Sequence, residues 1–107
     1  MRNLITAIFA LVLVAPGLAT SGPIDQATAL APYSRYFKVR VAAARLLTGR
    51  ADAASRANLW RLAEDGHPMV RMAALRGLLQ LGGAEGRLAR RRVAVDPDPL
   101  LRAQLLR

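Results

Sequence analysis

The chain has no cysteine, one histidine and only five aromatic side chains among its 107 residues. Without cysteine it can form neither a disulfide framework nor the lipid-modified cysteine of a bacterial lipoprotein signal. The usual zinc sites combine cysteines or several histidines, so His67 alone cannot build one. The fold must therefore be held together by packing.

Acidic side chains are also few: seven Asp and Glu residues face sixteen Lys and Arg residues, which gives a formal charge of +9 at pH 7. Only Lys38 is a lysine, so all the other basic residues are arginines. This excess indicates either a compositional bias toward arginine or attraction to an anionic partner. The placement of the arginines, and not their number, has to separate these two explanations.

Long apolar runs are absent except at the N-terminus. Residues 4–19 are almost all apolar, Arg2 supplies a positive charge before them, and Pro16 interrupts them. Gly17 and Ala19 place small residues three and one before a cut after Ala19, which is typical of secretory signals. The run is shorter than the ~20 residues that a membrane-spanning helix needs.

We therefore expect residues 1–19 to be a signal peptide and the protein to be exported, either to the periplasm or out of the cell. The alternative is an uncleaved N-terminal helix that anchors the chain in a membrane. Residues 20–35 are then a linker followed by an atypical N-terminal cap.

Glycine, proline and capping residues divide the remainder into helices. Asp52 suits an N-cap, Pro68 suits a first helical position, and Gly49 suits a left-handed C-terminal cap. No segment shows the strict alternation of a half-buried strand. The sequence therefore predicts an all-α protein, with helices over residues 24–31, 36–48, 52–64, 68–81 and 84–95 and a further helix from Pro99.

One pattern occurs three times at a spacing of 31 residues. Residues 37–45 align with residues 68–76 and with residues 99–107, so that arginines recur at the same two positions of each copy. A fixed period of roughly 20–50 residues is typical of stacked-repeat solenoids. The sequence predicts an α-solenoid of about two and a half helical hairpins, which offers a surface for binding.

Residues 62–82, with the sequence Leu-Ala-Glu-Asp-Gly-His-Pro-Met-Val-Arg-Met-Ala-Ala-Leu-Arg-Gly-Leu-Leu-Gln-Leu-Gly, carry a family resemblance. A shorter copy covers residues 93–103. The chain resembles the HEAT-like repeat family over residues 24–107, especially its short-period members of the phycobilin-lyase type. The resemblance implies HEAT-like repeats over residues 36–107 and a noncatalytic protein-interaction module or scaffold, which the predicted signal peptide would place in the cell envelope.

The family typically has an aspartate in the turn and an arginine early in the second helix, which form a ladder between adjacent repeats. Asp65 precedes Arg71 by six residues, and Asp96 precedes Arg102 by six. Ser34 stands where the first repeat would have its aspartate, which agrees with an atypical cap.

A physical argument supports a structural role for these arginines. On a helical projection Arg71 falls inside the apolar arc of its helix, and a buried, unpaired guanidinium would be costly. A carboxylate in the preceding turn of its own repeat or of an adjacent repeat would pair with it. We therefore interpret Arg40, Arg71 and Arg102 as structural residues.

Catalytic chemistry finds little support. His67 is followed by a proline, so the chain does not have the repeated His-Glu pairs of metal-binding HEAT-like enzymes. Ser34 and Ser55 have no base partner in sequence. Gly82-Gly83 is interpreted as a helix stop and not as a phosphate-binding loop. We expect no enzyme activity, no cofactor and no metal. The alternatives are a lyase-like or enzyme-accessory subunit that positions a ligand, or a fragment of a longer array.

The exposed face of the second helices is the predicted partner site. It is either an ordinary solvated face or a groove for an acidic or amphipathic partner segment. Its predicted residues are an arginine row and the side chains beside it: Lys38, Arg45, Met69, Met72, Arg76, Gln80 and Arg107.

Three further features leave alternatives open. Trp60 shares a helical stripe with Arg56 and either packs between repeats or joins the binding site. The basic run over residues 87–92 lacks interleaved aromatics, so we expect no nucleic acid there; an anionic lipid, an envelope polymer or plain solvent remains. The helix over 84–95 has only Leu88, Ala89, Val93 and Val95 to bury, so self-association through an open C-terminal end is a further alternative.

Overall fold

A computed structural model of the chain describes residues 30–50 and 52–107. The predicted signal peptide over residues 1–19 lies outside the described residues, and so does nearly all of the predicted helix over residues 24–31. Both therefore stay predictions.

The described residues form helices and connecting turns, with no strand among them. A single 3-10 turn comes first, and five α-helices follow it. In chain order the elements are η1 (Ala31–Tyr33), α4 (Phe37–Leu47), α5 (Ala53–Leu62), α6 (Pro68–Leu81), α7 (Gly83–Ala94) and α8 (Pro99–Leu105). The predicted all-α class is confirmed, and the predicted helix ends differ from the observed ones by at most two residues.

Side chains cap three of these helices at their first turns. The Asp52 carboxylate accepts the N–H of Ser55 before α5. His67 accepts the N–H of Met69 through Nδ1 before α6. Asp98 accepts the N–H of Leu100 before α8. Each cap satisfies backbone donors that have no partner inside the helix, so the chain is set to restart a helix at these points.

The prediction that Gly82-Gly83 stops the helix from Pro68 is confirmed, because α6 ends at Leu81, but the next helix begins earlier than predicted, at Gly83. Gly82, with φ of 68°, ends α6 and is at the same time the N-cap of α7, which begins at Gly83. Positive φ values at both glycines let the chain reverse within a single non-helical residue. The two helices are therefore joined more tightly than the sequence pattern indicates.

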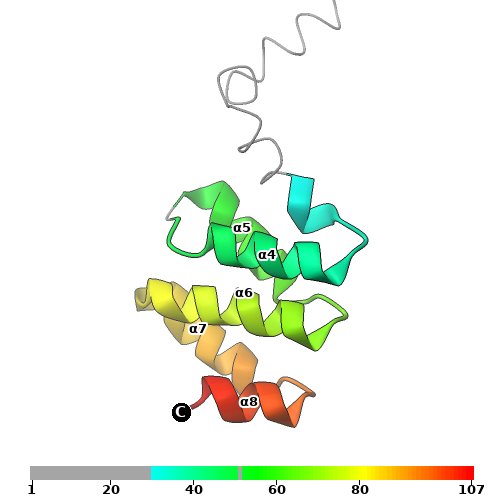
Figure 1. The fold of residues 1–107 in the computed structure, drawn as a ribbon. Coiled ribbons are helices and arrows are strands. Elements are labelled where there is room, and N and C mark those ends of the chain that lie inside the picture. Colours follow the sequence, from blue (N-terminus) through cyan, green and yellow to red (C-terminus); the bar gives the residue numbers. More distant parts are fainter. Residues whose placement is uncertain (1–29, 51) are drawn as a thin grey trace, which may run out of the picture. The chain divides into compact units, whose positions relative to one another are not determined.

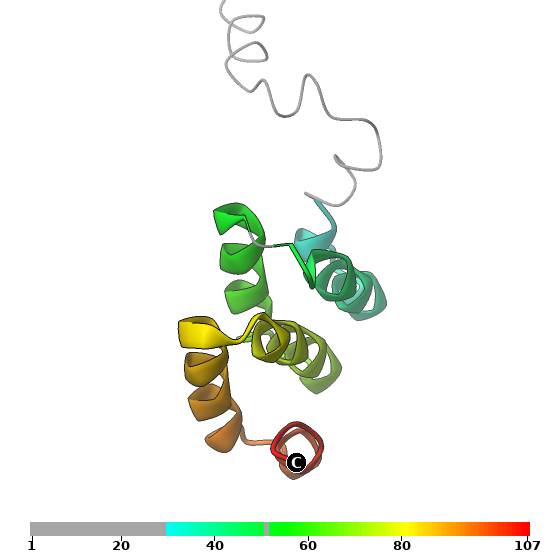
Figure 2. The same ribbon diagram turned by 90° about the vertical axis from the view of Figure 1, so that its left-hand side faces the viewer.

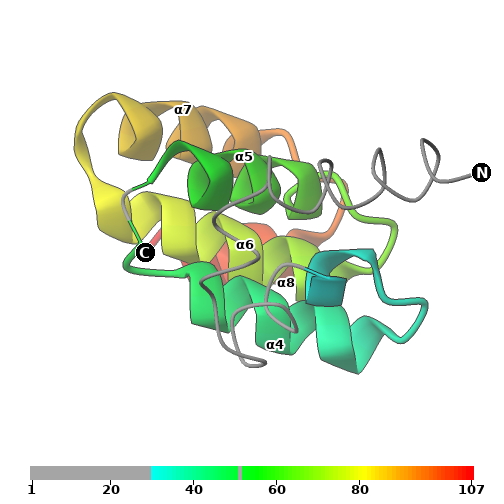
Figure 3. The ribbon, with the colours of Figure 1, turned by 90° about the horizontal axis from the view of Figure 1, so that it is seen from above.

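The helices of the compact unit Ala31–Arg107 lie in two layers (Figure 2). The second helices α4, α6 and α8 lie side by side in one layer and run in the same direction, as Figure 1 shows. The first helices α5 and α7 form the other layer and run back the opposite way, which is clear in the view from above (Figure 3). This is the α-solenoid architecture that the repeat spacing predicts.

Helix α6 lies at the centre of the stack, because it packs against α4, α5, α7 and α8. Buried aliphatic side chains from every helix meet around it and form one core. The largest of them are Val41, Leu47, Leu59, Leu62, Val70, Leu75, Leu78, Val93 and Leu101. Burial of this apolar surface is the main stabilising contribution to the fold.

The 31-residue register does not give every equivalent position the same surroundings. Val70 and Leu101 are fully buried, but their equivalent Val39 is 39% exposed. Helix α6 packs against α4 and α5, and α8 packs against α6 and α7, whereas η1 is the described element that precedes α4. The 31-residue spacing therefore aligns the three positions in sequence, but only Val70 and Leu101 share a buried environment.

A glycine sets the distance between α4 and α6. A Cβ atom added at Gly77 would lie 2.4 Å from Thr48 Oγ1 and 3.5 Å from Leu59 Cδ2. Only a residue without a side chain fits this contact, so Gly77 lets α6 approach α4 and α5 closely.

Within residues 30–50 and 52–107, none of the helices has both the length and the apolar character required to cross a membrane.

Candidate functional site

The arginines predicted to be structural connect one repeat to the next. Arg40 Nε lies 2.7 Å from Asp65 Oδ2, and Arg71 Nε lies 3.0 Å from Asp96 Oδ2. The Nη2 group of each arginine donates to the second oxygen of the same carboxylate. Both pairs therefore have the bidentate geometry that is strongest for a guanidinium and a carboxylate.

The same arginines also donate to their own repeat. Arg40 Nη1 donates to the backbone oxygen of Ser34 at 2.9 Å, and Arg71 Nη1 donates to that of Asp65 at 2.9 Å. Arg102 Nη1 makes the equivalent bond to the backbone oxygen of Asp96. Sequence reasoning left open whether the carboxylate comes from the same repeat or an adjacent one. It comes from the next repeat, and the arginine's own repeat supplies a carbonyl six residues earlier.

Burial and hydrogen bonding act in opposite directions on the two ladder aspartates. Burial raises the pKa of Asp65, but the hydrogen bonds from Arg40 and from the N–H of His67 lower it by more. The net result is a pKa below the ordinary value. Burial likewise raises the pKa of Asp96, and bonds from Arg71, the N–H of Asp98 and Arg92 bring it below the ordinary value. Both carboxylates are therefore ionised at neutral pH.

Every acidic side chain of the described part has a structural role. Asp52 and Asp98 cap helices, as described above, and Asp65 and Asp96 hold the ladder. The two glutamates connect the α5 side of the first-helix layer to α7. Glu64 accepts from Arg92 Nε at 2.8 Å, and Glu85 accepts from Trp60 Nε1 at 2.5 Å. The remaining arginines on the surface therefore define where the net positive charge is displayed.

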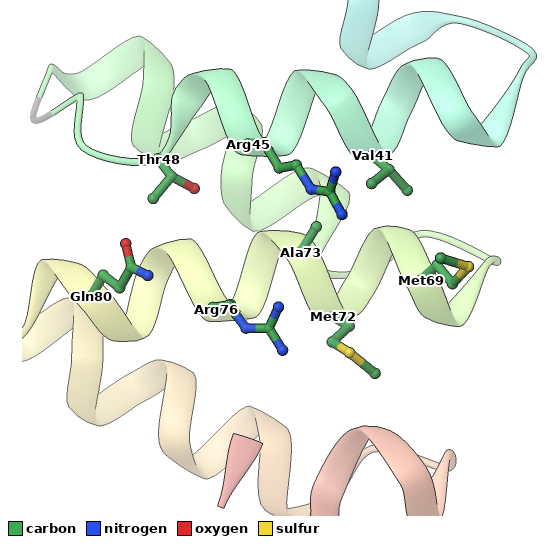
Figure 4. Close-up of a pocket in the computed structure, with 8 residues that line it drawn as sticks. All are labelled: Val41, Arg45, Thr48, Met69, Met72, Ala73, Arg76 and Gln80. Atoms are coloured by element: carbon green, nitrogen blue, oxygen red, sulfur yellow. The ribbon is translucent and has the colours of Figure 1, made fainter. Parts of the chain in front are cut away.

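A shallow groove of about 210 Å³ separates α4 and α6 on the second-helix layer. Its walls combine two arginines, two methionines and an amide with small apolar groups between them, and Figure 4 shows these side chains. The lining residues are Val41, Arg45 and Thr48 from α4 and its C-terminal cap, and Met69, Met72, Ala73, Arg76 and Gln80 from α6.

Arg45 and Arg76 occupy equivalent positions in consecutive repeats, and both side chains are exposed. No acidic side chain in residues 30–50 or 52–107 pairs with either of them. Figure 4 shows Arg45 extending from α4 toward the space between the helices and Arg76 lying on α6 below it. Both are available to a carboxylate or another anion from outside.

The structure places five of the predicted partner-site residues together, namely Arg45, Met69, Met72, Arg76 and Gln80. Lys38 is exposed on α4 but does not line the groove, and Arg107 lies beyond the end of α8. The sequence interpretation missed Val41, which lies one repeat before Met72 and could have been found from that spacing.

Trp60 lies in the other layer, away from the groove. Its indole donates to Glu85 on α7, and the Arg56 guanidinium lies 3.9 Å from the same carboxylate. The side chain is half-buried against the core. Trp60 therefore connects α5 to α7, which is the packing alternative that the sequence left open.

The residues that sequence reasoning considered for chemistry serve the fold. His67 caps α6, and its ring stacks on Phe37 with 3.9 Å between ring centroids. Ser55 Oγ donates to the capping Asp52, and Ser34 Oγ accepts the N–H of Tyr36. In the part of the chain that the structure describes, no three His, Asp or Glu side chains gather as a metal site would require.

The family model for HEAT repeats matches residues 24–107, which is most of the chain. The chain belongs to the HEAT repeat family. Members of this family generally mediate protein–protein interactions and are typically noncatalytic scaffolds. The searches of curated proteins and of solved structures gave no match.

Proposed function

We propose that this chain is a noncatalytic protein-interaction module of the cell envelope, and that it binds an acidic, amphipathic segment of a partner protein in the α4–α6 groove. The observation that carries the proposal is the pair Arg45 and Arg76. They line one groove from consecutive repeats and have no acidic partner in the described part of the chain. The location in the envelope rests on the predicted signal peptide over residues 1–19.

The groove has the two kinds of surface that such a segment needs. Ala73 provides apolar contact area above the nearly buried Val41, and Met69 and Met72 add flexible thioether side chains that adapt to varied apolar partners. Guanidinium groups at the edge form bidentate bonds with carboxylates, which select an acidic partner and favour fast association. A helix that lays its apolar face into the groove would meet both surfaces at once.

A defined peptide tests the groove directly. We expect a fluorescent amphipathic helix with leucines on one face and glutamates beside them to bind the full chain in fluorescence anisotropy. Replacing Arg45→Glu and Arg76→Glu together should weaken binding at least about tenfold, because two attractive contacts become repulsive. Rising salt should weaken wild-type binding as well.

The matched control is the double variant Lys38→Glu and Arg107→Glu. It makes the same change in net charge at two exposed residues outside the groove. It should bind the peptide nearly as the wild type does, apart from a small effect of net charge on association. Equal losses in both double variants would show that overall charge, and not the groove, attracts the peptide, and would reject the proposed site.

A second experiment addresses the natural partner and the location. A photo-crosslinking residue at Met72, in cells that produce the protein, should yield an adduct whose crosslinked peptide is acidic and amphipathic. Mass spectrometry of the purified protein should find an N-terminus immediately after Ala19. A protein that retains residues 1–19 and fractionates with the cytoplasm would contradict the envelope location but not the groove.

A further inference from the structure

The basic run on α7 is divided between two sides of the helix. Arg92 points toward the rest of the molecule, where it pairs with Glu64 at 2.8 Å and with Asp96 at 3.0 Å. Arg87, Arg90 and Arg91 are exposed, and no acidic side chain in residues 30–50 or 52–107 pairs with them. The helix therefore has one structural arginine and three that face solvent.

Large apolar side chains accompany these three arginines. Leu88 is 50% exposed and Val95 is 75% exposed. Sequence reasoning expected both to be buried, and that expectation was wrong. At about 100° per residue, Arg87, Arg91, Val95 and Leu88 fall within an arc of roughly 100°. Arg87 and Arg91 thus share one outer face with Leu88 and Val95, and Arg90 lies about 60° from Arg87 on the other side of it.

Small residues explain why this face turns outward. Gly86, Ala89 and Val93 form the buried side of α7. A Cβ atom at Gly86 would lie 3.4 Å from the backbone oxygen of Leu79, so α7 packs its glycine directly against the end of α6. This close contact orients the helix and leaves Leu88 and Val95 on the opposite side.

The start of α7 adds a second feature that suits an anion. A concavity of about 210 Å³ lies beside the α6–α7 turn, and no side chain caps the first turn of α7. Arg87 and Arg90 reach it from the helix, and glycines form much of the rest. Its lining residues are Leu79, Gly82, Gly83, Gly86, Arg87 and Arg90.

We infer that the outer face of α7 docks on an anionic phospholipid surface. Arg87, Arg90 and Arg91 bind headgroup phosphates, with the concavity beside Arg87 and Arg90 receiving one of them. Leu88 and Val95 enter the boundary between headgroups and acyl chains, while the arginine stems extend along it. The exposed apolar side chains favour a membrane over a hydrated anionic polymer, because a polymer would leave them in water.

This surface is independent of the proposed partner groove. Helix α7 belongs to the first-helix layer, and the α4–α6 groove belongs to the second-helix layer (Figure 2). A molecule held on a membrane through α7 would keep the groove free, so one face can tether the chain while the other receives a partner.

Vesicle flotation with the full chain tests the inference. The wild type should bind vesicles of phosphatidylcholine with about one third phosphatidylglycerol more strongly than vesicles of phosphatidylcholine alone. Each arginine near an anionic surface contributes about fivefold to binding, so Arg87→Gln with Arg91→Gln should reduce the phosphatidylglycerol-dependent part roughly 25-fold. Leu88→Gln with Val95→Gln should reduce binding as well. The size of this loss should change little with salt, because it comes from apolar contacts.

The control is again Lys38→Glu with Arg107→Glu, which alters net charge outside α7 and should keep phosphatidylglycerol-dependent binding within about twofold. Residues 1–19 are the same in every variant, so the differences report on α7. Circular dichroism should show unchanged helix content, because the three substituted residues of α7 and its C-cap Val95 are all exposed.

Three results would overturn the inference. One is no preference for phosphatidylglycerol in the wild type, and another is an equal loss in the control variant. The third is a Leu88→Gln and Val95→Gln variant that binds the vesicles as the wild type does, together with full displacement of the protein from the vesicles by soluble polyphosphate. This result would indicate that the surface binds an anionic polymer instead of a membrane. Failure here leaves the peptide experiment on the groove unaffected.

Discussion

Asp96 receives Arg71 from the repeat before it, with 3.0 Å between Asp96 Oδ2 and Arg71 Nε. The aspartate side chain is fully buried, and that of Arg71 is 11% exposed. The same carboxylate accepts from Arg92 Nη1 at 3.0 Å and from the N–H of Asp98 at 2.9 Å. One aspartate thus connects α6, α7 and the turn before α8, so its removal should affect the whole C-terminal half of the stack.

The two ladder aspartates should differ in their contribution to stability. Asp96→Ala leaves the buried Arg71 without a carboxylate, although its Nη1 still donates to the backbone oxygen of Asp65, and this should cost about 3–4 kcal/mol in the free energy of unfolding. Asp65→Ala should cost less, about 1–2 kcal/mol, because its partner Arg40 is 19% exposed and can reach water. Urea denaturation followed by circular dichroism measures both values. An Asp65→Ala variant that unfolds as the wild type does would show that the ladder contributes no stability.

Stability should fall in acid because of the same two residues. Burial raises the pKa of each, but the arginine and amide hydrogen bonds lower it below the ordinary value of 3.8. A pKa lowered in the folded state adds stability that is present above the unfolded-state pKa and lost as pH falls through the folded-state pKa. The free energy of unfolding should therefore decrease as pH drops below about 4–5.

An amide in place of one carboxylate separates this effect from general acid denaturation. Asp96→Asn removes one of the titrating groups, so its free energy of unfolding should depend less steeply on pH below about 4. The same slope in wild type and variant would mean that other carboxylates dominate the acid response.

Local signals in the sequence were sufficient for much of the fold. Asp52 and Asp98 are followed by helix starts, and Pro68 begins α6 as expected, because capping is decided by neighbouring residues. The 31-residue spacing gave the stacking order, and the family match agrees with it. The helical projection also placed Arg71 in the core, where it is indeed buried.

Contacts between repeats were harder to predict. The sequence left open whether the carboxylate that pairs with Arg71 comes from its own repeat or an adjacent one, and the structure places it 25 residues away, on Asp96. The distance between adjacent turns depends on how closely the hairpins stack, which no local pattern encodes. The orientation of α7 was missed for a similar reason, since the approach of Gly86 to α6 decides which side is buried.

The close approach of α4 and α6 should be sensitive to a single methyl group. Gly77→Ala would normally stabilise a helix by about 0.5–1 kcal/mol. Here its Cβ would lie 2.4 Å from Thr48 Oγ1 and 3.3 Å from Thr48 Cβ, so overpacking should outweigh that gain by about 1 kcal/mol. Thr48 also lines the groove, so peptide binding should weaken as well.

A double-mutant cycle tests this explanation. In a Thr48→Ala background the 2.4 Å contact is gone, and Gly77→Ala should become neutral or stabilising in urea denaturation. The same destabilisation in both backgrounds would show that the cost arises elsewhere, for example against Leu59.

The ladder geometry predicts how the stack can be extended. Arg102 repeats the bond of Arg40 and Arg71 to a carbonyl in its own repeat, but no carboxylate in the described part of the chain accepts from its Nε or Nη2. Beside it Leu106 is 40% exposed, although its equivalent one repeat earlier, Leu75, is fully buried. The α8 end thus has both surfaces that a further hairpin would cover.

We expect that fusing one designed helical hairpin after Arg107, with an aspartate 25 residues beyond Arg102, raises the melting temperature. A new interface buries apolar surface, and the aspartate supplies a carboxylate to Arg102 Nε and Nη2, for which the described residues provide none. The matched control is the same hairpin with alanine at that position, which should stabilise less because it provides the apolar contact alone. If aspartate and alanine hairpins stabilise equally, the Arg102 position is not equivalent to Arg40 and Arg71, since an added carboxylate in the same register would then form no pair.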